Sequence, residues 1–455
     1  MQEKLREFHS RICGEAVTVL GIGVSNTPLI EYLVKYGAKV SACDKREEDA
    51  LGEVAAHLKD LGVTLHLGKD YLKHIDGNLV FKTPGMRYDL PELNQARDRG
   101  AEITSEMEVL FELCPSTIIA VTGSDGKTTT TTLIHEMLSR EGYHTYLGGN
   151  IGTPLLTKVD EMKPEDIVVL ELSSFQLHTM KKSPHVAVIT NLAPNHLNWH
   201  TDMEEYLDAK KNIFRYQQAT DRLILNYDNE ITRACADESQ GETVFFSRLH
   251  AVDGISIKDG VICYGEETVL PVSDIFLPGV HNVENYMAAI GAVWGLVKKE
   301  TVCEVAKTFR GVAHRIEPVR ELDGVKYYND SIASSPSRTT AGLNAFDQKV
   351  ILIAGGCDKK IPFDDFGFVV KDHVKALILM GETADKIEQA VLAACGNEAP
   401  MPIFRVDSME EAVLAAKGAA HEGDVIMLSP ACASFDKYKN FEERGNHFKR
   451  IVEGL

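Results

Sequence analysis

The chain has 455 residues, of which 44% are apolar, and these values predict a globular enzyme of two to four domains. Its net charge of −19 argues against a nucleic-acid-binding surface. The nine cysteines include no Cys-x-x-Cys pair and are expected to be reduced. No apolar run is long enough to cross a membrane, and residues 1–15 lack a signal-peptide core, so we expect a cytoplasmic protein.

The first predicted unit is a strand–helix–strand segment with a glycine loop. A strand over 16–20 enters Gly21-Ile-Gly23, a helix follows, and a second strand over 39–43 ends at Asp44. This is most of a dinucleotide-binding fingerprint, but Asn26 occupies the third glycine position. An NAD-binding oxidoreductase and a strand–helix unit without a ligand both remain open at this point.

A second glycine loop follows the apolar, β-branched strand predicted over 118–121. The loop, Gly123-Ser-Asp-Gly-Lys-Thr128, opens a helical pattern. Such a loop presents backbone N–H groups and a helix dipole to an anion, with lysine reaching phosphates and threonine ligating Mg²⁺. Val121 stands where the full P-loop pattern has a glycine, so this is a shortened variant. The alternative is a plain strand-to-helix turn with a surface lysine.

Further polar residues follow other predicted strands. Glu171 ends the strand that begins at residue 167. In a parallel sheet this end adjoins the loop Gly123–Thr128, which we call the phosphate loop, so the Glu171 carboxylate can hold Mg²⁺. An acidic residue at a strand end is also common without a metal. His196 follows the strand over 186–191, and a lone histidine in that position is more often not a ligand. Asn282 and Asn285 share a helix face as caps or as nucleotide ligands.

The last segment contains predicted strands over 326–330, 350–354, 377–380 and 425–428, with helical patterns between them. It indicates a second open α/β sheet. We therefore predict an α/β protein with domains at 1–104, 105–311 and 312–455.

Several motifs then occur in one order along nearly the whole chain. They are Gly123–Thr128, Gly149–Gly152, Glu171–Gln176, His281-Asn282, His314-Arg315, Asn329–Ser331 and Leu428–Ser434. In these motifs the chain resembles the ATP-dependent Mur ligases of peptidoglycan synthesis. The runs Glu171–Gln176 and Ser429–Phe441 look like those of the members that add D-glutamate to UDP-N-acetylmuramoyl-L-alanine.

The resemblance implies three domains: a Rossmann-like domain that binds the UDP-linked substrate, a central P-loop domain that binds ATP, and a C-terminal Rossmann-like domain for the amino acid and nucleotide. In this family ATP phosphorylates the carboxylate of the muramoyl substrate, and the incoming amino group attacks the acyl phosphate. We accordingly expect ATP and Mg²⁺ as cofactors, UDP-N-acetylmuramoyl-L-alanine and D-glutamate as substrates, no nucleic-acid or membrane partner, and a monomer.

The resemblance also assigns residues to roles. Catalysis is expected from Lys127, Glu171, His196 and Lys210. Metal binding is expected from Thr128, Glu171, His196 and Lys210, the last as a carbamylated lysine. ATP binding is expected from Gly123, Ser124, Asp125, Gly126, Lys127, Thr128, Thr129, Asn282, Asn285, Arg315 and Asp330. Substrate binding is expected from Ser25, Asp44, Arg46, Asn150, Ser173, Lys359, Ser434, Phe435 and Phe441.

Two positions depart from the family pattern. Asp125 stands where asparagine is usual, and because a carboxylate repels phosphates we expect its side chain to face a cation or solvent. Ile332 replaces a lysine that fixes the amino-acid substrate, a task that Lys359 with Lys360 could carry. A folylpolyglutamate synthase, which lacks the first domain, and a non-catalytic nucleotide-binding regulator remain the competing interpretations.

Overall fold

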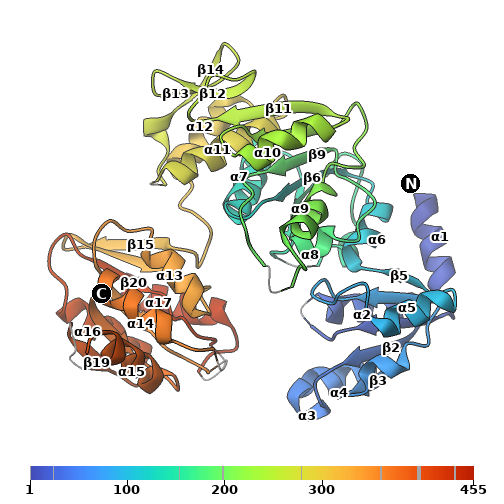
Figure 1. Cartoon of the computed structure of the whole chain (residues 1–455), viewed down its shortest axis with the longest axis horizontal. Coiled ribbons are helices and arrows are strands. Elements are labelled where there is room, and N and C mark those ends of the chain that lie inside the picture. The colour runs from blue at the N-terminus through green and yellow to red at the C-terminus, as the bar shows by residue number, and fades with distance from the viewer. Residues whose placement is uncertain are drawn as a thin grey trace. The chain divides into compact units, whose positions relative to one another are not determined.

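The computed structural model describes residues 2–23, 25–152, 154–196, 199–277, 279–358, 361–396, 401–434 and 437–455. The chain forms two compact units, Met1–Phe309 and Arg310–Leu455. Figure 1 follows the chain from the N-terminal sheet in blue to the C-terminal sheet in red. The first unit contains two sheets and the second unit contains one.

The N-terminal sheet is parallel, with the strand order β3-β2-β1-β4-β5. Its strands are β1 (Ala16–Leu20), β2 (Lys39–Asp44), β3 (Thr64–Leu67), β4 (Leu79–Lys82) and β5 (Glu102–Thr104). Its helices are α1 (Gln2–Ile12), α2 (Asn26–Lys35), α3 (Glu48–Leu51), α4 (Glu53–Asp60) and α5 (Pro91–Asp98), with the 3₁₀ turn η1 (Tyr71–His74). The order reverses between β1 and β4, and ligands bind at such a switch point in open α/β sheets.

The central sheet has nine strands in the order β14-β13-β12-β11-β10-β9-β6-β8-β7, antiparallel only from β12 to β14. Its strands are β6 (Thr117–Thr122), β7 (Thr145–Gly149), β8 (Ile167–Glu171), β9 (Val186–Ile189), β10 (Arg222–Asn226), β11 (Glu242–Ser247), β12 (Gly254–Lys258), β13 (Val261–Tyr264) and β14 (Glu267–Pro271). Its helices are α6 (Glu106–Leu113), α7 (Lys127–Glu141), α8 (Ser174–Leu177), α9 (Met203–Lys211), α10 (Glu230–Ala234), α11 (Val280–Val293) and α12 (Lys299–Thr308), with η2 (Leu156–Lys158), η3 (Cys235–Glu238) and η4 (Val272–Asp274).

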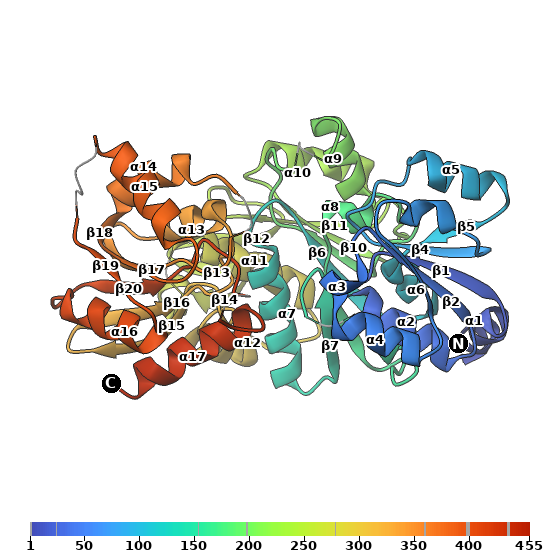
Figure 2. The same ribbon diagram turned by 90° about the horizontal axis from the view of Figure 1, so that it is seen from below.

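The two faces of the central sheet belong to different apolar cores. Helices α7 and α11 lie side by side on one face, as Figure 2 shows, and their apolar side chains share a core with Ile119 and Val121 of β6. The other face, including Ile118 and Ala120, belongs to the core that continues into the N-terminal sheet. Strand β6 is therefore buried on both sides, which explains its continuous apolar sequence.

The second unit is built on one mixed sheet of order β15-β16-β20-β17-β18-β19, in which only β15 runs antiparallel to its neighbour. Its strands are β15 (Glu317–Leu322), β16 (Val325–Asn329), β17 (Val350–Ala354), β18 (Val374–Leu379), β19 (Ile403–Arg405) and β20 (Val425–Leu428). Its helices are α13 (Pro336–Leu343), α14 (Asp364–His373), α15 (Ala384–Ala394), α16 (Met409–Gly418) and α17 (Phe441–Glu453).

The α/β class with a phosphate loop on the central sheet is confirmed, while the domain boundaries remain predictions.

Candidate active site

The phosphate loop joins the end of β6 to the start of α7. Gly123 has φ 151° and Gly126 has φ 75°, which an L side chain adopts only with strain. A Cβ atom on Gly123 would lie 2.0 Å from Thr190 Oγ1, and one on Gly126 would lie 2.4 Å from Asn285 Oδ1. The path of the chain therefore requires both glycines. Since the first N–H groups of a helix have no partner within it, this junction can bind an anion.

Glu171 connects the phosphate loop to the neighbouring strand. It lies opposite Val121 in the parallel pair β6–β8 and is 2% exposed. Thr128 Oγ1 donates to its Oε2 at 2.7 Å, and Asn150 Nδ2 donates to its Oε1 at 2.8 Å. Carboxylate, hydroxyl and amide oxygens are the donors that Mg²⁺ takes in proteins. The donors gathered here therefore fit this ion.

Two lysines converge on the carbonyl oxygen of Gly123. Lys127 Nζ donates to it at 2.9 Å and also to Ser124 O at 2.8 Å. Lys210 Nζ donates to the same carbonyl at 2.8 Å and to Thr122 Oγ1 at 3.0 Å. Burial, and then the charge of Lys127, hold the pKa of Lys210 well below its ordinary value. A lysine in such surroundings can lose its proton and react as an amine.

His196 follows β9 with φ 56° and an exposed side chain. Its ring centroid lies 5.0 Å from that of Phe175. Partial burial, and then the charges of Lys127 and Lys210, lower the pKa of His196. A neutral imidazole is the form that binds metals, so the surroundings of His196 are compatible with its predicted role.

The other predicted loop residues differ in their surroundings. Ser124 is buried, donates from Oγ to Ala193 O at 2.9 Å, and lies 2.9 Å from Tyr206 Oη. Asp125 is exposed, and its backbone N–H donates to Asn191 Oδ1 at 2.9 Å. Thr129 is half-buried in the first turn of α7. Ser124 thus serves to fix the loop, while the carboxylate of Asp125 is open to solvent.

Helix α11 completes this side of the site. Asn285 Nδ2 donates to Asn282 Oδ1 at 3.2 Å, and Thr130 Oγ1 donates to Asn285 Oδ1 at 3.2 Å. A cavity of about 130 Å³ opens between the phosphate loop and α11. Its lining consists of Asp125, Gly126, Thr190, Asn191, Phe246, His281, Glu284 and Asn285.

Five of these lining residues are absent from the predicted site: Thr190, Asn191, Phe246, His281 and Glu284. Thr190 and Asn191 directly follow β9, so their position at the carboxyl end of a strand could have indicated them. His281 directly precedes the predicted Asn282, and Glu284 directly precedes the predicted Asn285. Phe246 has no such signal, since it belongs to a strand whose neighbours are set by the sheet order.

The predicted substrate residues of the N-terminal domain meet at the carboxyl ends of β1 and β2. Asp44 accepts from the N–H groups of Ile22 at 2.7 Å and Arg46 at 2.9 Å, and from the Arg46 side chain. Burial opposes ionisation of Asp44, but these hydrogen bonds and the Arg46 charge hold its pKa below the ordinary value. Ser25 is exposed at the start of α2, and Asn26 donates to Leu20 O and Gly21 O.

Asn26 therefore fastens the glycine loop at the position where the fingerprint has its third glycine.

Ser173, the remaining predicted substrate residue of the first unit, caps α8. Its Oγ accepts from Gln176 N–H and donates to Gln176 Oε1. A serine at position 173 is therefore explained by helix capping as well as by its predicted role in substrate binding.

In the second unit, Asp330 and Ser434 are buried, Phe441 is half-buried and Arg315 is exposed. Asp330 accepts from Ser429 Oγ at 2.7 Å and from Ile316 N–H at 3.2 Å. Burial raises the pKa of Asp330 to about 7. The predicted residues Lys359 and Phe435 lie outside the described residues.

Comparison with known families then accounts for the whole layout. The chain matches the Mur ligase MurD-like N-terminal domain over 15–105, the Mur ligase middle domain over 121–293, and the Mur ligase glutamate ligase domain over 314–432. The chain belongs to the Mur ligase family. The phosphate loop and Glu171 lie in its middle domain, and Asp44 lies in its MurD-like N-terminal domain.

Curated relatives and solved structures extend this Mur ligase match to full length. The chain is 55% identical to the UDP-N-acetylmuramoylalanine--D-glutamate ligase of Acetivibrio thermocellus and 52% identical to that of Clostridium novyi, covering 100% of both chains in each pair. The structure of UDP-N-acetylmuramate-alanine ligase MurC from Thermotoga maritima is 21% identical, with a TM-score of 0.57 over 97% of this chain and 99% of that one. MurF from Acinetobacter baumannii is 16% identical, with a TM-score of 0.56 over 98% and 92%.

At these identities the two solved structures support the Mur ligase fold alone. Among the helices of the described ranges, none is both long and apolar enough to span a bilayer.

Proposed function

We propose that this Mur ligase joins D-glutamate to UDP-N-acetylmuramoyl-L-alanine, forming ADP and phosphate. The observation that carries the proposal is the 55% identity over the full length of a relative that bears this activity in its name. A phosphate loop whose threonine meets a buried glutamate supports the ATP-dependent step. We further propose that the reaction takes place in the cytoplasm and that the enzyme is a monomer.

The first chemical step forms the acyl phosphate. A carboxylate oxygen of the muramoyl substrate attacks the γ-phosphorus of ATP, and the bond to the β-phosphate oxygen breaks to release ADP. Lys127 and the N–H groups at the start of α7 would hold the transferring phosphoryl group, since such a step requires positioning and charge stabilisation. Thr128 and Glu171, with His196 and a carbamylated Lys210, would hold Mg²⁺, which neutralises phosphate charge when it is bound.

The second step forms the amide. The amino nitrogen of D-glutamate attacks the acyl carbon, the tetrahedral intermediate expels phosphate, and the nitrogen loses a proton. Ser434 and Phe441 would surround the amino acid together with Lys359 and Phe435. Asn282, Asn285, Arg315 and Asp330 would bind the nucleotide. Ser25, Asp44 and Arg46 would bind the uridine diphosphate end of the muramoyl substrate, with Asn150 and Ser173 near its other end.

Phosphate release from ATP tests this proposal. The purified chain is mixed with Mg²⁺-ATP, UDP-N-acetylmuramoyl-L-alanine and one amino acid from a panel that contains both enantiomers of glutamate. We expect the fastest release with D-glutamate and a product whose mass equals the two substrates less water. Faster release with L-glutamate would overturn the proposed amino-acid specificity but leave the acyl-phosphate step in place. The specificity needs this test because Ile332 replaces the family lysine that fixes the amino-acid substrate.

A paired comparison of two lysine variants shows whether the phosphate loop performs the reaction. Lys127→Ala removes a charge used in the transition state and should slow phosphate release by two or more orders of magnitude, about 3 kcal/mol. Lys73→Ala removes an exposed lysine of the N-terminal domain, whose side chain forms an ion pair with Asp70, and should leave the rate unchanged. Near-normal turnover of Lys127→Ala would refute the assignment of the loop.

A further inference from the structure

A loop of the N-terminal domain reaches the central domain beside the candidate active site. This loop, residues 83–89, follows β4 at the carboxyl end of the N-terminal sheet. Thr83 N–H donates to Leu20 O at 3.0 Å, and a Cβ atom on Gly21 would lie 3.2 Å from the Thr83 side chain. The loop is therefore packed against the glycine loop to which we assign the uridine diphosphate of the substrate. We call residues 83–89 the substrate-side loop.

The substrate-side loop is fixed to the central domain chiefly by Arg87. Its guanidinium donates to both carboxylate oxygens of Glu205, at 2.9 and 3.2 Å, and to Trp199 O at 3.1 Å. It also lies 5.2 Å from the centroid of the Trp199 ring. Trp199 Nε1 in turn donates to Gly85 O at 2.8 Å, and the Tyr88 ring lies 4.8 Å from the His178 ring. A bidentate arginine pair of this kind defines a direction as well as a distance.

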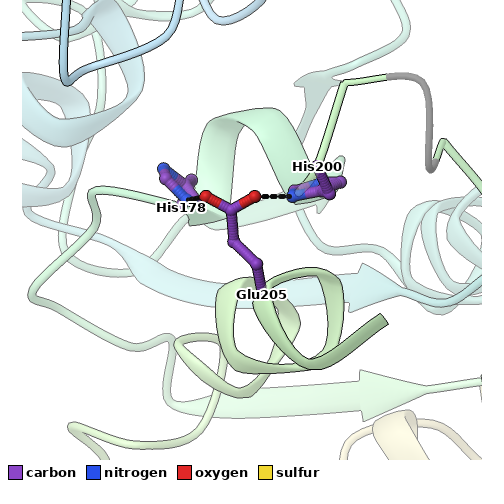
Figure 3. A group of neighbouring side chains, drawn as sticks. All are labelled: His178, His200 and Glu205. Atoms are coloured by element: carbon purple, nitrogen blue, oxygen red, sulfur yellow. Dashed lines mark hydrogen bonds and ion pairs between the residues drawn. The ribbon is translucent and has the colours of Figure 1, made fainter. Parts of the chain in front are cut away.

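The central domain holds Glu205 in place from several sides. Figure 3 shows its carboxylate between His178 and His200. His178 Nε2 lies 3.2 Å from one oxygen, and His200 Nδ1 lies 3.6 Å from the other. Thr201 N–H donates to the carboxylate at 2.6 Å. Ser174 Oγ lies 2.9 Å from His200 Nε2, so it fixes the ring through the nitrogen that does not face Glu205.

Glu205 belongs to α9, the helix that also carries Lys210. The two residues are five positions apart, about 7.5 Å along a helix axis, and Lys210 donates to Gly123 O of the phosphate loop at 2.8 Å. A series of direct contacts thus runs from the substrate-side loop through Arg87, Glu205 and α9 to the phosphate loop. We call the Arg87–Glu205–Trp199 group the interdomain clasp.

The same cluster has the composition of a metal site, because His178, His200 and Glu205 offer ligand atoms that lie within 4.8 Å of one another. Arg87, however, already occupies both oxygens of Glu205. A divalent cation among these groups would stand beside the guanidinium charge and repel it at close range. Hydrogen bonding to Arg87 lowers the pKa of Glu205 to about 2. Burial lowers the pKa of His200 to about 4 and lowers that of His178 below its ordinary value, so both histidines are neutral partners of an Arg–Glu pair at neutral pH.

We propose that Arg87 is a positioning residue of the ligase reaction. By holding the substrate-side loop on Glu205 and Trp199, it delivers the carboxylate of the muramoyl substrate to the phosphate loop. This inference rests on the proposed function, because it concerns the alignment of that substrate with ATP. Arg87 donates to Asp89 within its own loop and to Glu205 and Trp199 O of the central domain, so its link to the phosphate loop runs through Glu205 and α9.

Kinetics of Arg87→Ala, Arg87→Lys, Glu205→Gln and the Arg87→Ala/Glu205→Gln double variant test the clasp. Losing a charged hydrogen-bonding pair should lower kcat/KM for UDP-N-acetylmuramoyl-L-alanine by roughly tenfold to a hundredfold. The KM for ATP should stay within about twofold, because the bonds within the phosphate loop do not involve Arg87. Arg87→Lys should recover only part of the loss, since lysine cannot form the bidentate pair.

The double variant should be no worse than the poorer single variant, because the two side chains act on each other. Arg11→Ala is the matched control: Arg11 pairs with Glu102 within the N-terminal domain, where both side chains are about half exposed, and its loss should leave all constants unchanged. Additive losses in the double variant, or an ATP KM that rises as much as the substrate KM, would overturn the clasp.

A fluorescence measurement tests the clasp without relying on activity. The chain has two tryptophans, and Trp294 stacks on Tyr264 away from the clasp, so Trp294→Phe leaves Trp199 as the only reporter. Adding Arg87→Ala should shift the Trp199 emission to longer wavelength, as its ring loses the guanidinium and meets water, while the thermal unfolding midpoint changes little.

If the wild-type chain releases no phosphate with these substrates, the proposed function fails, and the clasp is judged on Trp199 alone. An unchanged emission in Arg87→Ala then overturns it. Titration of the wild-type chain with Zn²⁺ gives the remaining outcome. Micromolar binding that is lost in Glu205→Gln would identify a metal site in place of the clasp.

Discussion

Lys210 combines deep burial with a place next to the phosphate loop. It is 2% exposed, and its Nζ donates to the Thr122 hydroxyl and the Gly123 carbonyl and lies 5.1 Å from the centroid of the Tyr206 ring. Burial and then the Lys127 charge lower the pKa of Lys210 well below its ordinary value, which favours the neutral amine over the ammonium form. Such an amine can add to CO₂, forming an N–C bond and releasing a proton. The resulting carbamate is an anion that can join Glu171 in binding Mg²⁺.

We therefore predict that Lys210→Ala is strongly impaired and that short carboxylic acids, which can occupy the space of a carbamate, restore part of the activity. Lys211→Ala is the matched control, because Lys211 is the next residue and pairs with Glu238 near the surface. Phosphate release is measured for both variants with and without acetate or propionate. Full activity of Lys210→Ala, or an equal loss in Lys211→Ala, would contradict the carbamate assignment.

At the scale of elements, the junction between β6 and α7 depends on a residue without a side chain. Gly126 caps the start of α7 with φ 75°, and Gly142 caps its end with φ 109°. A Cβ atom on Gly126 would lie 2.4 Å from Asn285 Oδ1, whereas one on Gly142 would meet nothing within 4 Å. The same substitution at the two ends of one helix therefore separates backbone strain from a steric clash in the site.

Both Gly126→Ala and Gly142→Ala should lose roughly 1–2 kcal/mol of stability from the left-handed backbone. Only Gly126→Ala should also raise the KM for ATP, by about tenfold or more, because the clash displaces Asn285 or the start of α7. Thermal unfolding and the ATP dependence of phosphate release measure the two effects. A normal ATP KM in Gly126→Ala would show that the junction tolerates a methyl group and that its geometry is not needed for nucleotide binding.

The elements that the sequence predicts best are continuous apolar strands. The predicted strands at 16–20, 118–121, 350–354 and 425–428 correspond to β1, β6, β17 and β20 within one residue at each end, because buried parallel strands need no alternation. The hairpin of β12 and β13 was not predicted. Its Asp259-Gly260 turn has φ 49° and 76°, and such a pair between two short strands was a usable signal.

Contacts between distant parts of the chain also divide into those that the sequence could indicate and those that it could not. Thr128 and Glu171 could be expected to meet, since Glu171 ends strand β8 and Thr128 lies just beyond the carboxyl end of the parallel neighbour β6 in the same sheet. The pair Arg87–Glu205 spans 118 residues and depends on how two domains pack. No local pattern around residue 87 indicates it, and only the folded structure brings the pair together.

At the scale of the whole molecule, two buried aspartates should shift stability in opposite directions as pH changes. Burial raises the pKa of Asp330, which follows β16, from 3.8 to about 7. The folded chain therefore retains a proton that the unfolded chain loses, so this contribution to stability is complete below pH about 4 and is lost as the pH rises through 7. The pKa of Asp44 is held below 3.8, so its contribution is present above that value and is lost as the pH falls.

We predict that Asp330→Asn stabilises the protein at about pH 8, by up to about 4 kcal/mol, and changes little at about pH 5, where the wild-type carboxyl is already mostly protonated. Asp44→Asn should instead destabilise at both values, because Ile22 N–H and Arg46 lose their anionic acceptor. Calorimetric unfolding of the wild type and each variant at the two pH values measures these differences. For each variant the comparison uses the unfolding transition that the substitution shifts. Equal destabilisation by Asp330→Asn at both pH values would mean that its carboxylate is ionised in the folded state, held by Ser429 and Ile316 N–H in the way that Arg46 holds Asp44.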